Sequence, residues 1–519
     1  MAFSTIFREI VFKESRDNGA RAAPPPRSSR SMTLRRVCFA SWSTAATRGF
    51  TAWRIPLRQF SSVNVGQPSF ETHPHLMQQG EFTPGFSAAE YAHRRARLVD
   101  TLPPNSVALF AAAAPVHLPN TIIPYPAYRQ DADFAYLTGV TQPGVVGMVQ
   151  VGETRGESKY TLFVPPKSKH SDVWNGPRIS VEAAVGHFAS DEAHEIVGDN
   201  MANVITSAVA SARGGVFLDE GVLRFDDSIR ATLGTAAKRP PQALRPVVHQ
   251  LRWVKSSAEL LAIRKSVNAD IEGFKEAMRW SIDGTDEHEV GARHEFVTKR
   301  NGAQRLAYPS VVASGPGALV VHYAAMDKLM RDGELLLMDA GCERNGYVSD
   351  ITRTWPVSGA FTTAQADVYE AVLDAHAACV AAARVGVSLH ELHQISVSVL
   401  QDGLRNLGVG SPLSKGGNGV TQNIQKFYPH SVGHWLGMDT HDTPTVSTQT
   451  PLTAGNAFTI EPGLYFPLDA ADVPHSLRGI GVRIEDNLAV NHRGAVEVLS
   501  EALPVHRREV EQFLRELRS

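Results

Sequence analysis

The sequence has few cysteines and no long hydrophobic run, and each absence excludes a class of protein. Three cysteines, Cys38, Cys342 and Cys379, are spread over 519 residues with neither zinc-finger nor disulfide-framework spacing, as in proteins of a reducing compartment. No apolar run reaches the roughly 18 residues that a membrane span needs. With 43% hydrophobic and 20% charged residues, the composition is that of a globular chain, long enough for about two or three domains.

Acidic residues are missing from a long N-terminal stretch. The first 60 residues hold ten Arg, one Lys and three acids, and no acid lies between Asp17 and Glu71. A segment rich in Arg, Ser and Ala and poor in acids is typical of a mitochondrial transit peptide, so residues 1–60 predict one and a matrix location. The alternative is a disordered basic tail that binds nucleic acid or acidic partners. Without this segment the chain has 40 basic and 50 acidic residues, and we expect no nucleic-acid partner.

The next part of the chain has the pattern of an α/β domain. We expect a linker over residues 61–83 and a domain over 84–250, ending near the proline-rich "KRPPQALRPVV". Its first helical pattern is "SAAEYAHRRARLVDTL". Four segments are strand-like and together predict a mixed sheet: "SVALFAAAA", "GVVGMVQVG", "YTLFVPP" and "GGVFLDEG".

Residues 251–519 have the pattern of an α+β domain, with long helices and antiparallel strands. Three capping boxes predict helix starts, at Ser256, Thr362 and Ser388, each followed three residues later by Glu or Gln. The second of these helices is expected to end at Gly386 and the third near Gly408. A loop rich in Gly and Ser follows at 410–420, and then strand patterns such as "AFTIEPGLYF" and "GIGVRIEDNLAVN".

A predicted hairpin, "ELLLMDAGCERNGYVSDITRTWPV", carries an aspartate in each of two apolar strands. A type I′ turn at Asn345-Gly346 places Asp339 opposite Thr352. Asp350 is two residues from Thr352 and therefore lies on the same face as Asp339, about 7–8 Å away. Two buried carboxylates require a cation between them or become protonated. The alternative is that each pairs with Arg344 or Arg353, or lies exposed at the hairpin edge.

Three more polar residues stand where strand patterns predict burial: His434, Glu461 and Glu485. Taken singly, each is more often a satisfied core residue or a member of an ion pair. Together with the two hairpin aspartates they make four carboxylates and one imidazole. Structural zinc sites prefer thiolates, whereas this set suits two divalent ions such as Mn²⁺, Co²⁺ or Zn²⁺. Two metals about 3.5–4 Å apart can hold and deprotonate a bridging water.

These residues also carry a family resemblance. "MDAGCERNGYVSDITRTW", "HSVGHWLGMDTHD", "TIEPGLYF" and "GVRIEDN" resemble the successive metal-binding segments of the pita-bread metallopeptidases, which include methionine aminopeptidase, prolidase and aminopeptidase P; the order and the eleven-residue spacing between the aspartates match. The resemblance implies a pita-bread catalytic domain. It also implies that Asp350 and Glu485 bridge two metal ions, that Asp339 binds one ion, and that His434 and Glu461 bind the other.

The same resemblance implies roles for further residues. Glu461 helps to take the proton from the bridging hydroxide. His322 in "VVHYAAMDK" and His441 in "DTHD" flank the scissile bond and stabilise the tetrahedral intermediate. The supporting positions around the site are matched by His430, Tyr465 and Arg483. Because Arg483 is two residues from Glu485 on one strand, it shares that face and is placed to orient the Glu485 carboxylate.

The N-terminal half narrows the resemblance to one branch. "GQPSFETHPHLMQQGEFTPGFSAAEYAHRRARL" and "YRQDADFAYLTGVTQPGVV" resemble the N-terminal domain of aminopeptidase P, especially its mitochondrial branch, and the resemblance spans residues 66 to about 505. No residue of "YRQDADF" is expected to act in catalysis. The resemblance implies a metalloaminopeptidase that removes one N-terminal residue from peptides or proteins, with Mn²⁺ the expected ion, and a homodimer.

Two substrate classes fit this branch, and three other functions compete with it. The substrates are peptides with proline in second place and imported proteins whose presequence has been cut. A prolidase would need a cationic group for the C-terminal carboxylate of a dipeptide. A catalytically inactive pita-bread binding module lacks metal ligands, and a creatine-type hydrolase of this fold works without metal. All five ligands are present, which disfavours the last two.

Overall fold

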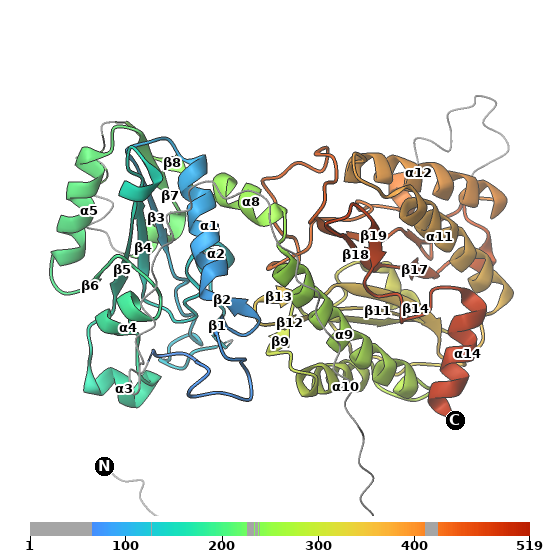
Figure 1. Ribbon diagram of the computed structural model, residues 1–519. Coiled ribbons are helices and arrows are strands. Elements are labelled where there is room, and N and C mark those ends of the chain that lie inside the picture. The colour runs from blue at the N-terminus through green and yellow to red at the C-terminus, as the bar shows by residue number, and fades with distance from the viewer. Residues whose placement is uncertain (1–64, 126, 226–232, 234–236, 238, 410–423) are drawn as a thin grey trace, which may run out of the picture. The chain divides into compact units, whose positions relative to one another are not determined.

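The computed structural model describes residues 65–125, 127–225, 233, 237, 239–409 and 424–519 (Figure 1). The predicted transit peptide at 1–60 and the predicted loop at 410–420 lie outside these ranges. The described residues form one compact unit. Within the described ranges, no helix combines the length and the apolar character that crossing a bilayer requires.

A six-stranded mixed sheet organises the N-terminal half, in the order β6-β5-β4-β3-β7-β8. Its strands are β3 (Ser106–Ala111), β4 (Val146–Gln150), β5 (Lys159–Val164), β6 (Glu192–Glu195), β7 (Gly215–Leu218) and β8 (Gln242–Ala243). β3-β4 and β4-β5 pair antiparallel, and the remaining pairs are parallel. The mixed sheet predicted from the sequence is therefore confirmed, although β6 and β8 had no recognisable strand pattern.

Alternate residues of β3 face two different layers, as strand geometry requires. Val107 and Leu109 belong to the apolar cluster that includes α5 (Asn200–Ser211), whereas Ala108 and Phe110 belong to the cluster that includes α1 (Ala88–Thr101). Figure 1 shows α5 and α1 on opposite sides of the sheet. Shorter elements complete this half: β1 (Glu81–Thr83), β2 (Phe86–Ser87), α2 (Ala132–Thr138), η1 (Arg155–Glu157), α3 (Lys169–Asn175), α4 (Val181–Gly186) and α6 (Glu220–Phe225).

Helix α8 (Arg245–Trp253) runs across position 250, where the sequence predicts the end of the first domain. The helices that follow are α9 (Ser257–Trp280), α10 (Glu287–Arg300), α11 (Thr363–Ala382), α12 (Leu389–Asn406), α13 (Ile424–Phe427) and α14 (Arg507–Arg518), with short 3-10 turns η2 (Gly315–Leu319) and η3 (His475–Leu477). All three predicted capping boxes are formed, because each N-cap side chain accepts from the backbone N–H three residues on, and the side chain of that residue accepts from the N-cap backbone N–H. α11 ends at Ala382, earlier than the predicted end at Gly386.

The C-terminal half is α+β, as predicted, with its strands in several small antiparallel sheets. One sheet has the order β10-β11-β14, from Val311–Ser314, Leu335–Ala340 and Ile351–Pro356. The others are β13-β12-β9 (Tyr347–Val348, Cys342–Arg344, Arg305–Leu306), β15-β18-β19 (Ala457–Ile460, Asp486–Val490, Val496–Val498) and β16-β17 (Gly463–Tyr465, Gly481–Arg483). A bridge between Thr352 and Glu485 joins β14 to the residue before β18, so two strands distant in sequence meet there.

Candidate metal centre and active site

The hairpin has the register that its turn predicts. Asn345 and Gly346 both have positive φ, 54° and 77°, and Asp339 pairs with Thr352. The two aspartates converge, because the Tyr308 hydroxyl lies 2.6 Å from Asp339 Oδ1 and also hydrogen-bonds Asp350 Oδ1. The turn therefore places both carboxylates on one face of the hairpin.

The alternative pairing of these aspartates with hairpin arginines is not what the structure shows. Arg353 is buried and donates to Asp486 Oδ1 at 2.6 Å, on the side away from the two aspartates. Asp339 instead accepts a hydrogen bond from Arg483 Nη2 at 2.6 Å. Arg483 comes from β17, which is far from the hairpin in sequence.

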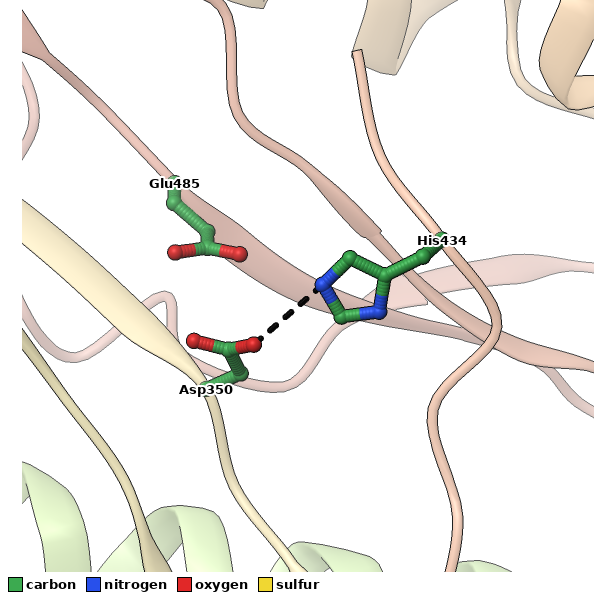
Figure 2. A group of neighbouring side chains, drawn as sticks. All are labelled: Asp350, His434 and Glu485. Atoms are coloured by element: carbon green, nitrogen blue, oxygen red, sulfur yellow. Dashed lines mark ion pairs between the residues drawn. The ribbon is translucent and has the colours of Figure 1, made fainter. Parts of the chain in front are cut away.

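All five predicted ligands lie together. Asp350, His434 and Glu485 each offer an atom within 4.8 Å of the others (Figure 2). His434 Nε2 lies 3.3 Å from Asp350 Oδ2 and 3.5 Å from Glu461 Oε1. Asp339 joins the group through the shared Tyr308 hydroxyl. Strand β11, the residues just before β14 and β18, the residue just after β15 and the 430–442 segment thus bring four carboxylates and one imidazole to one place.

The donor set fits divalent metal ions. Glu485 is 1% exposed, and its Oε1 has no hydrogen-bond partner among the described residues, whereas its Oε2 accepts from Thr352 Oγ1 at 2.8 Å. A buried carboxylate oxygen without a donor is costly unless a cation is bound. His434 Nδ1 lies 3.1 Å from the carbonyl oxygen of Trp435. Donation from Nδ1 leaves the Nε2 lone pair facing the carboxylates, as in metal-binding histidines.

Crowding of the carboxylates shifts their proton affinity. Burial, followed by the charge of Asp350, raises the pKa of Glu485 well above its usual value and that of Glu461 to about 7. Burial also raises the pKa of Asp339, against the lowering effect of Arg483. Burial lowers the pKa of His434, but its hydrogen bond to Asp350 and the neighbouring carboxylate charges outweigh that effect and raise it to about 9. The metal-free site therefore holds protons at neutral pH.

Metal uptake is therefore expected to release protons. Metal ions bind deprotonated ligands, so the apparent affinity for Mn²⁺ should rise with pH, most clearly around pH 7, where Glu461 loses its proton. Calorimetric titration of metal-free protein with Mn²⁺ at pH 7, in buffers of different ionisation enthalpy, measures the released protons. A binding heat that is the same in every buffer would contradict this electrostatic account.

The three supporting residues form one hydrogen-bonded chain. Arg483 Nη1 donates to the Tyr465 hydroxyl at 2.8 Å, and that hydroxyl lies 2.9 Å from His430 Nε2. Burial and the charge of Arg483 lower the pKa of His430 to about 4, so this ring is neutral. The position of Arg483 on the strand suggested that it would orient the Glu485 carboxylate directly. In the structure it does so through Thr352: Arg483 Nε donates at 3.1 Å to Thr352 Oγ1, which itself donates to Glu485.

His322 and His441 lie at the exposed rim of the site. The His441 ring is 4.3 Å from the His434 ring, centroid to centroid. Burial, followed by the charge of His434, lowers the pKa of His441, which favours its neutral form. The charge of His322 contributes to the lowered pKa of both His430 and His441. His441 is therefore next to the cluster, His322 lies near His430 and His441, and both His322 and His441 are open to solvent.

Three residues that hold the cluster were not predicted from the sequence. Tyr308 contacts two of the aspartates, and Thr352 links Arg483 to Glu485. Asn487 hydrogen-bonds both backbone groups of Asp350: its Oδ1 accepts from the Asp350 N–H at 3.0 Å, and its amide N–H donates to the Asp350 carbonyl. The predicted hairpin register identified Thr352 as the cross-strand partner of Asp339, but it did not indicate that Thr352 bonds Glu485. Tyr308 follows no pattern that would have marked it.

Two protein-family models and several known proteins match this chain. Residues 262–492 match metallopeptidase family M24, and residues 91–217 match the aminopeptidase P N-terminal domain. Intermediate cleaving peptidase 55, mitochondrial, of Arabidopsis thaliana is 36% identical over 87% of this chain and 88% of its own length. Xaa-Pro aminopeptidase 3 of Homo sapiens is 34% identical over 90% of this chain and 94% of its own.

A solved structure agrees with these sequence relatives. Zn-substituted Escherichia coli aminopeptidase P in complex with product superposes with a TM-score of 0.77 at 30% identity, covering 84% of this chain and 99% of that one. The family works with divalent metal ions, and its peptidase members act on peptides or proteins. The chain therefore belongs to metallopeptidase family M24, as a metalloaminopeptidase of the aminopeptidase P type.

Proposed function

We propose that the chain is a mitochondrial aminopeptidase that uses two divalent metal ions to remove a single N-terminal residue from its substrates. The observation that carries the proposal is the convergence of four carboxylates and one imidazole, with one buried Glu485 oxygen left without a donor among the described residues. Four negative charges balance two divalent cations, and no structural role accounts for such a cluster.

In this proposal each ligand has its own role. Asp350 and Glu485 would be the ligands shared by both ions, Asp339 would hold one ion, and His434 and Glu461 would hold the other. Mn²⁺ is the proposed metal, with Co²⁺ and Zn²⁺ as alternatives, since a carboxylate and imidazole site accepts each of them. When bound, such a pair supplies Lewis acidity and lowers the pKa of a water molecule.

The remaining steps belong to side chains. Glu461, deprotonated when the metal ions are bound, accepts the proton of the attacking water. His441 in its neutral form, and His322 beside it, donate hydrogen bonds to the oxygen on which negative charge develops. His430, Tyr465 and Arg483 keep the ligands in place through their hydrogen-bonded chain and complete the substrate-binding surface.

Location and substrate follow from the relatives and from the N-terminal composition. One relative is named as mitochondrial and as an intermediate cleaving peptidase, and the other as an Xaa-Pro aminopeptidase. The acid-poor residues 1–60 support import into mitochondria, with the matrix as the proposed compartment. We therefore propose two substrate classes: peptides with proline in second place, and imported proteins trimmed after their presequence is removed. The homodimer that the resemblance implies stays a prediction.

One assay tests the enzymatic proposal and ranks its substrates. The protein is offered a peptide that begins Tyr-Ser, a peptide that begins Xaa-Pro, and an Xaa-Pro dipeptide, each before chelation, after chelation and after Mn²⁺ is restored. We expect one or both longer peptides to lose one residue, to resist cleavage after chelation, and to be cleaved again with Mn²⁺. If no substrate is cleaved in a chelator-sensitive way, the proposal fails.

The dipeptide arm of this assay separates an aminopeptidase from a prolidase. A prolidase needs a free cationic group for the C-terminal carboxylate. Arg483, the arginine within the cluster, already donates to Asp339, Thr352 and Tyr465. We therefore expect the dipeptide to be the poorest of the three substrates, and a clear preference for it would reassign the enzyme as a prolidase.

A further inference from the structure

Arg129 lies in the "YRQDADF" segment, to which the sequence gave no role in catalysis, and its side chain reaches two segments of the catalytic half. Its Nε donates to Glu343 Oε2 on β12. Its Nη2 donates to the carbonyl oxygen of Met438 at 2.6 Å and to Asp439 Oδ1 at 3.0 Å. One guanidinium thus bonds the hairpin strand and the loop that follows His434.

These two segments carry different parts of the metal centre. The hairpin carries Asp339 and Asp350, and the loop carries His434 and His441. They meet where Val348 N donates to the Gly437 carbonyl at 3.0 Å, close to the 3.3 Å contact between His434 and Asp350. Since the segments are far apart in sequence, their spacing depends on the contacts that join them directly and on the groups that span them.

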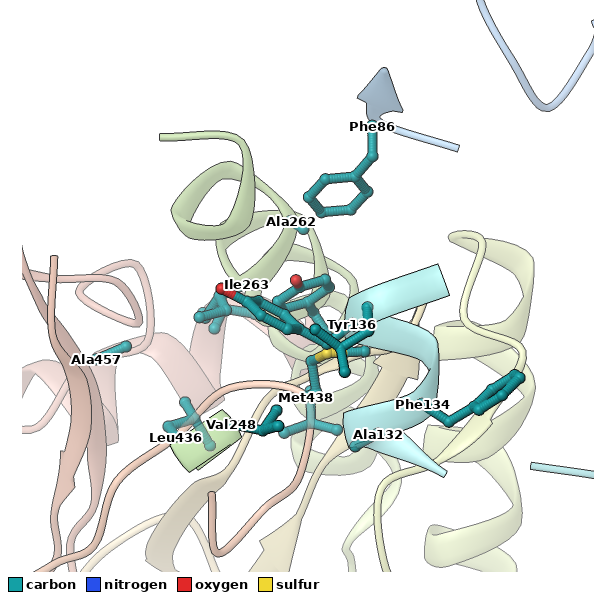
Figure 3. Packing of buried hydrophobic residues seen from close by; sticks show 14 of the residues in the cluster. Phe86, Ala132, Phe134, Tyr136, Val248, Ala262, Ile263, Leu436, Met438 and Ala457 are labelled. Carbon is teal, nitrogen blue, oxygen red and sulfur yellow. The ribbon is translucent and has the colours of Figure 1, made fainter. Parts of the chain in front are cut away.

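Apolar packing holds the loop at Met438. Met438 belongs to the same buried cluster as Ala132 and Tyr136 of α2, which follows Arg129 in the chain (Figure 3). The loop backbone is thus held by packing at Met438 and by charge at its carbonyl. The segment that carries Arg129 is therefore fixed at its C-terminal end by the buried helix α2.

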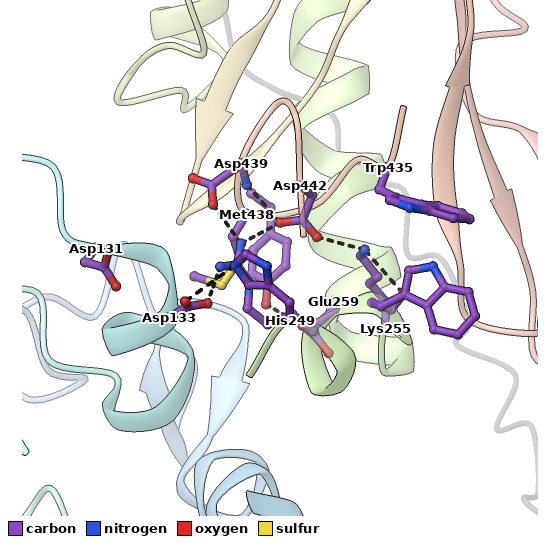
Figure 4. A network of polar contacts seen from close by, with 12 residues as sticks. Asp131, Asp133, His249, Lys255, Glu259, Trp435, Met438, Asp439 and Asp442 are labelled. Carbon is purple, nitrogen blue, oxygen red and sulfur yellow. Dashed lines mark hydrogen bonds and ion pairs between the residues drawn. The ribbon is translucent and has the colours of Figure 1, made fainter. Parts of the chain in front are cut away.

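The acceptors of Arg129 depend on it to different degrees. The Glu343 side chain is 8% exposed, and its other partner, Arg305, is 3.6 Å away. Asp439 has a second partner, Arg252, at 2.8 Å, and Figure 4 shows Asp439 beside the buried Asp442. The planar guanidinium presents its donors in a fixed fork that spans both segments, whereas an ammonium group is a compact point charge without that fork. Loss of Arg129 would weaken the bridge most at Glu343.

We propose that Arg129 is a positioning residue for the metal centre: it fixes the distance between the hairpin and the His434 loop, and thereby the placement of His434 and His441 opposite Asp350. This inference rests on the proposed metal site and adds to it a contribution from the N-terminal domain. Removing a side chain that orients a metal ligand typically lowers metal affinity or activity about 10- to 100-fold.

The test measures Mn²⁺ binding rather than turnover alone. Metal-free wild type, Arg129→Ala and Arg129→Lys are titrated with Mn²⁺ by calorimetry, and the thermal midpoint of each metal-free protein is recorded. We expect the dissociation constant of Arg129→Ala to rise about 10- to 100-fold with an unchanged midpoint. The dissociation constant of Arg129→Lys should rise less, because lysine keeps the positive charge near Glu343 but lacks the forked geometry of the guanidinium. kcat should fall in the same order.

Two further variants complete the design. Arg155→Ala removes an exposed arginine of the same domain that pairs with Asp100, and it should bind Mn²⁺ like wild type. Glu343→Gln breaks the proposed bridge from its other end, so its effect combined with Arg129→Ala should be smaller than the sum of the two. Should Arg129→Ala fail to fold, Arg129→Lys and Glu343→Gln carry the test.

Three results would overturn the proposal. Arg129→Ala could bind Mn²⁺ within twofold of wild type, so that the bridge has no effect on the site. Its affinity and its thermal midpoint could fall together, so that Arg129 serves the fold and not the ligands. Wild type could bind no Mn²⁺ at all, which would refute the metal site itself and is distinguished from the other two by the wild-type titration.

Discussion

Asp350→Ala is expected to abolish binding of both metal ions, whereas Asp339→Ala should leave one. Asp350 lies at the centre of the cluster, since it contacts His434 at 3.3 Å, shares Tyr308 with Asp339 and lies within 4.8 Å of Glu485. Asp339 lies at one side and is already partly neutralised by Arg483. Metal content after loading with Mn²⁺ and desalting measures the difference.

Turnover should follow metal content. A single electrostatic stabiliser of the transition state is commonly worth about 10²- to 10³-fold in rate, so Asp350→Ala should lose at least about 10³-fold. Asp472→Ala is the matched control, because Asp472 is a partly exposed aspartate of the same domain that pairs with Lys426. It should keep two ions and full activity. Equal and full metal content in Asp350→Ala and Asp339→Ala would contradict their separate roles.

The second large effect is expected at Arg252, on stability rather than on metal binding. Arg252 is 2% exposed, and it donates to Asp133 Oδ1 at 2.5 Å, to Asp439 Oδ2 at 2.8 Å and to Asp442 Oδ1. After Arg252→Met, Asp442 keeps Lys255 at 3.0 Å (Figure 4), Asp439 keeps Arg129 at 3.0 Å, and Asp133 keeps Arg245 only at 3.8 Å. Removing one partner of a buried ion pair costs about 3–5 kcal/mol.

Urea denaturation at pH 7 measures the loss in free energy of unfolding. Arg155→Ala again serves as control, because its ion pair with Asp100 is about half exposed and such pairs contribute about 0–1 kcal/mol. Arg252 joins Asp133 of the N-terminal half to Asp439 and Asp442 of the C-terminal half. A loss for Arg252→Met no larger than that of Arg155→Ala would show that this network does not stabilise the fold.

The same network predicts a pH dependence of stability. Burial raises the pKa of Asp442, but Arg252 and Lys255 outweigh it and lower the value to about 2. An unfolded aspartate titrates near about 3.9. A carboxyl group with a lowered folded-state pKa stabilises the fold above its unfolded pKa, and this contribution is lost as the pH falls from about 4 to about 2. Arg252→Met should weaken that dependence.

Local signals made the hairpin and the helix starts predictable. Asn345-Gly346 restricts the turn to positive φ, which sets the register and thus the shared face of Asp339 and Asp350. Capping boxes at Ser256 and Ser388 act within four residues, so the sequence contains both partners. The ligand residues themselves were recognisable because charged side chains interrupt buried strands.

Long-range partners were not predictable in the same way. Arg483 shares a strand face with Glu485, yet it bonds Asp339 and Thr352, because the packing of β17 against the hairpin decides its direction. Arg129 meets Glu343 and Asp439 from the other half of the chain. No pattern within one segment encodes such pairs. The short helices of the N-terminal half were missed for a related reason: with fewer than two turns they show little periodicity.

The central claim is that five side chains hold two metal ions: Asp339, Asp350, His434, Glu461 and Glu485. Anomalous diffraction from crystals of the Mn²⁺-loaded enzyme tests it most directly. The account predicts two anomalous peaks about 3.5–4 Å apart, with Asp350 and Glu485 in contact with both. An active enzyme whose crystals show no peak among these side chains would contradict it.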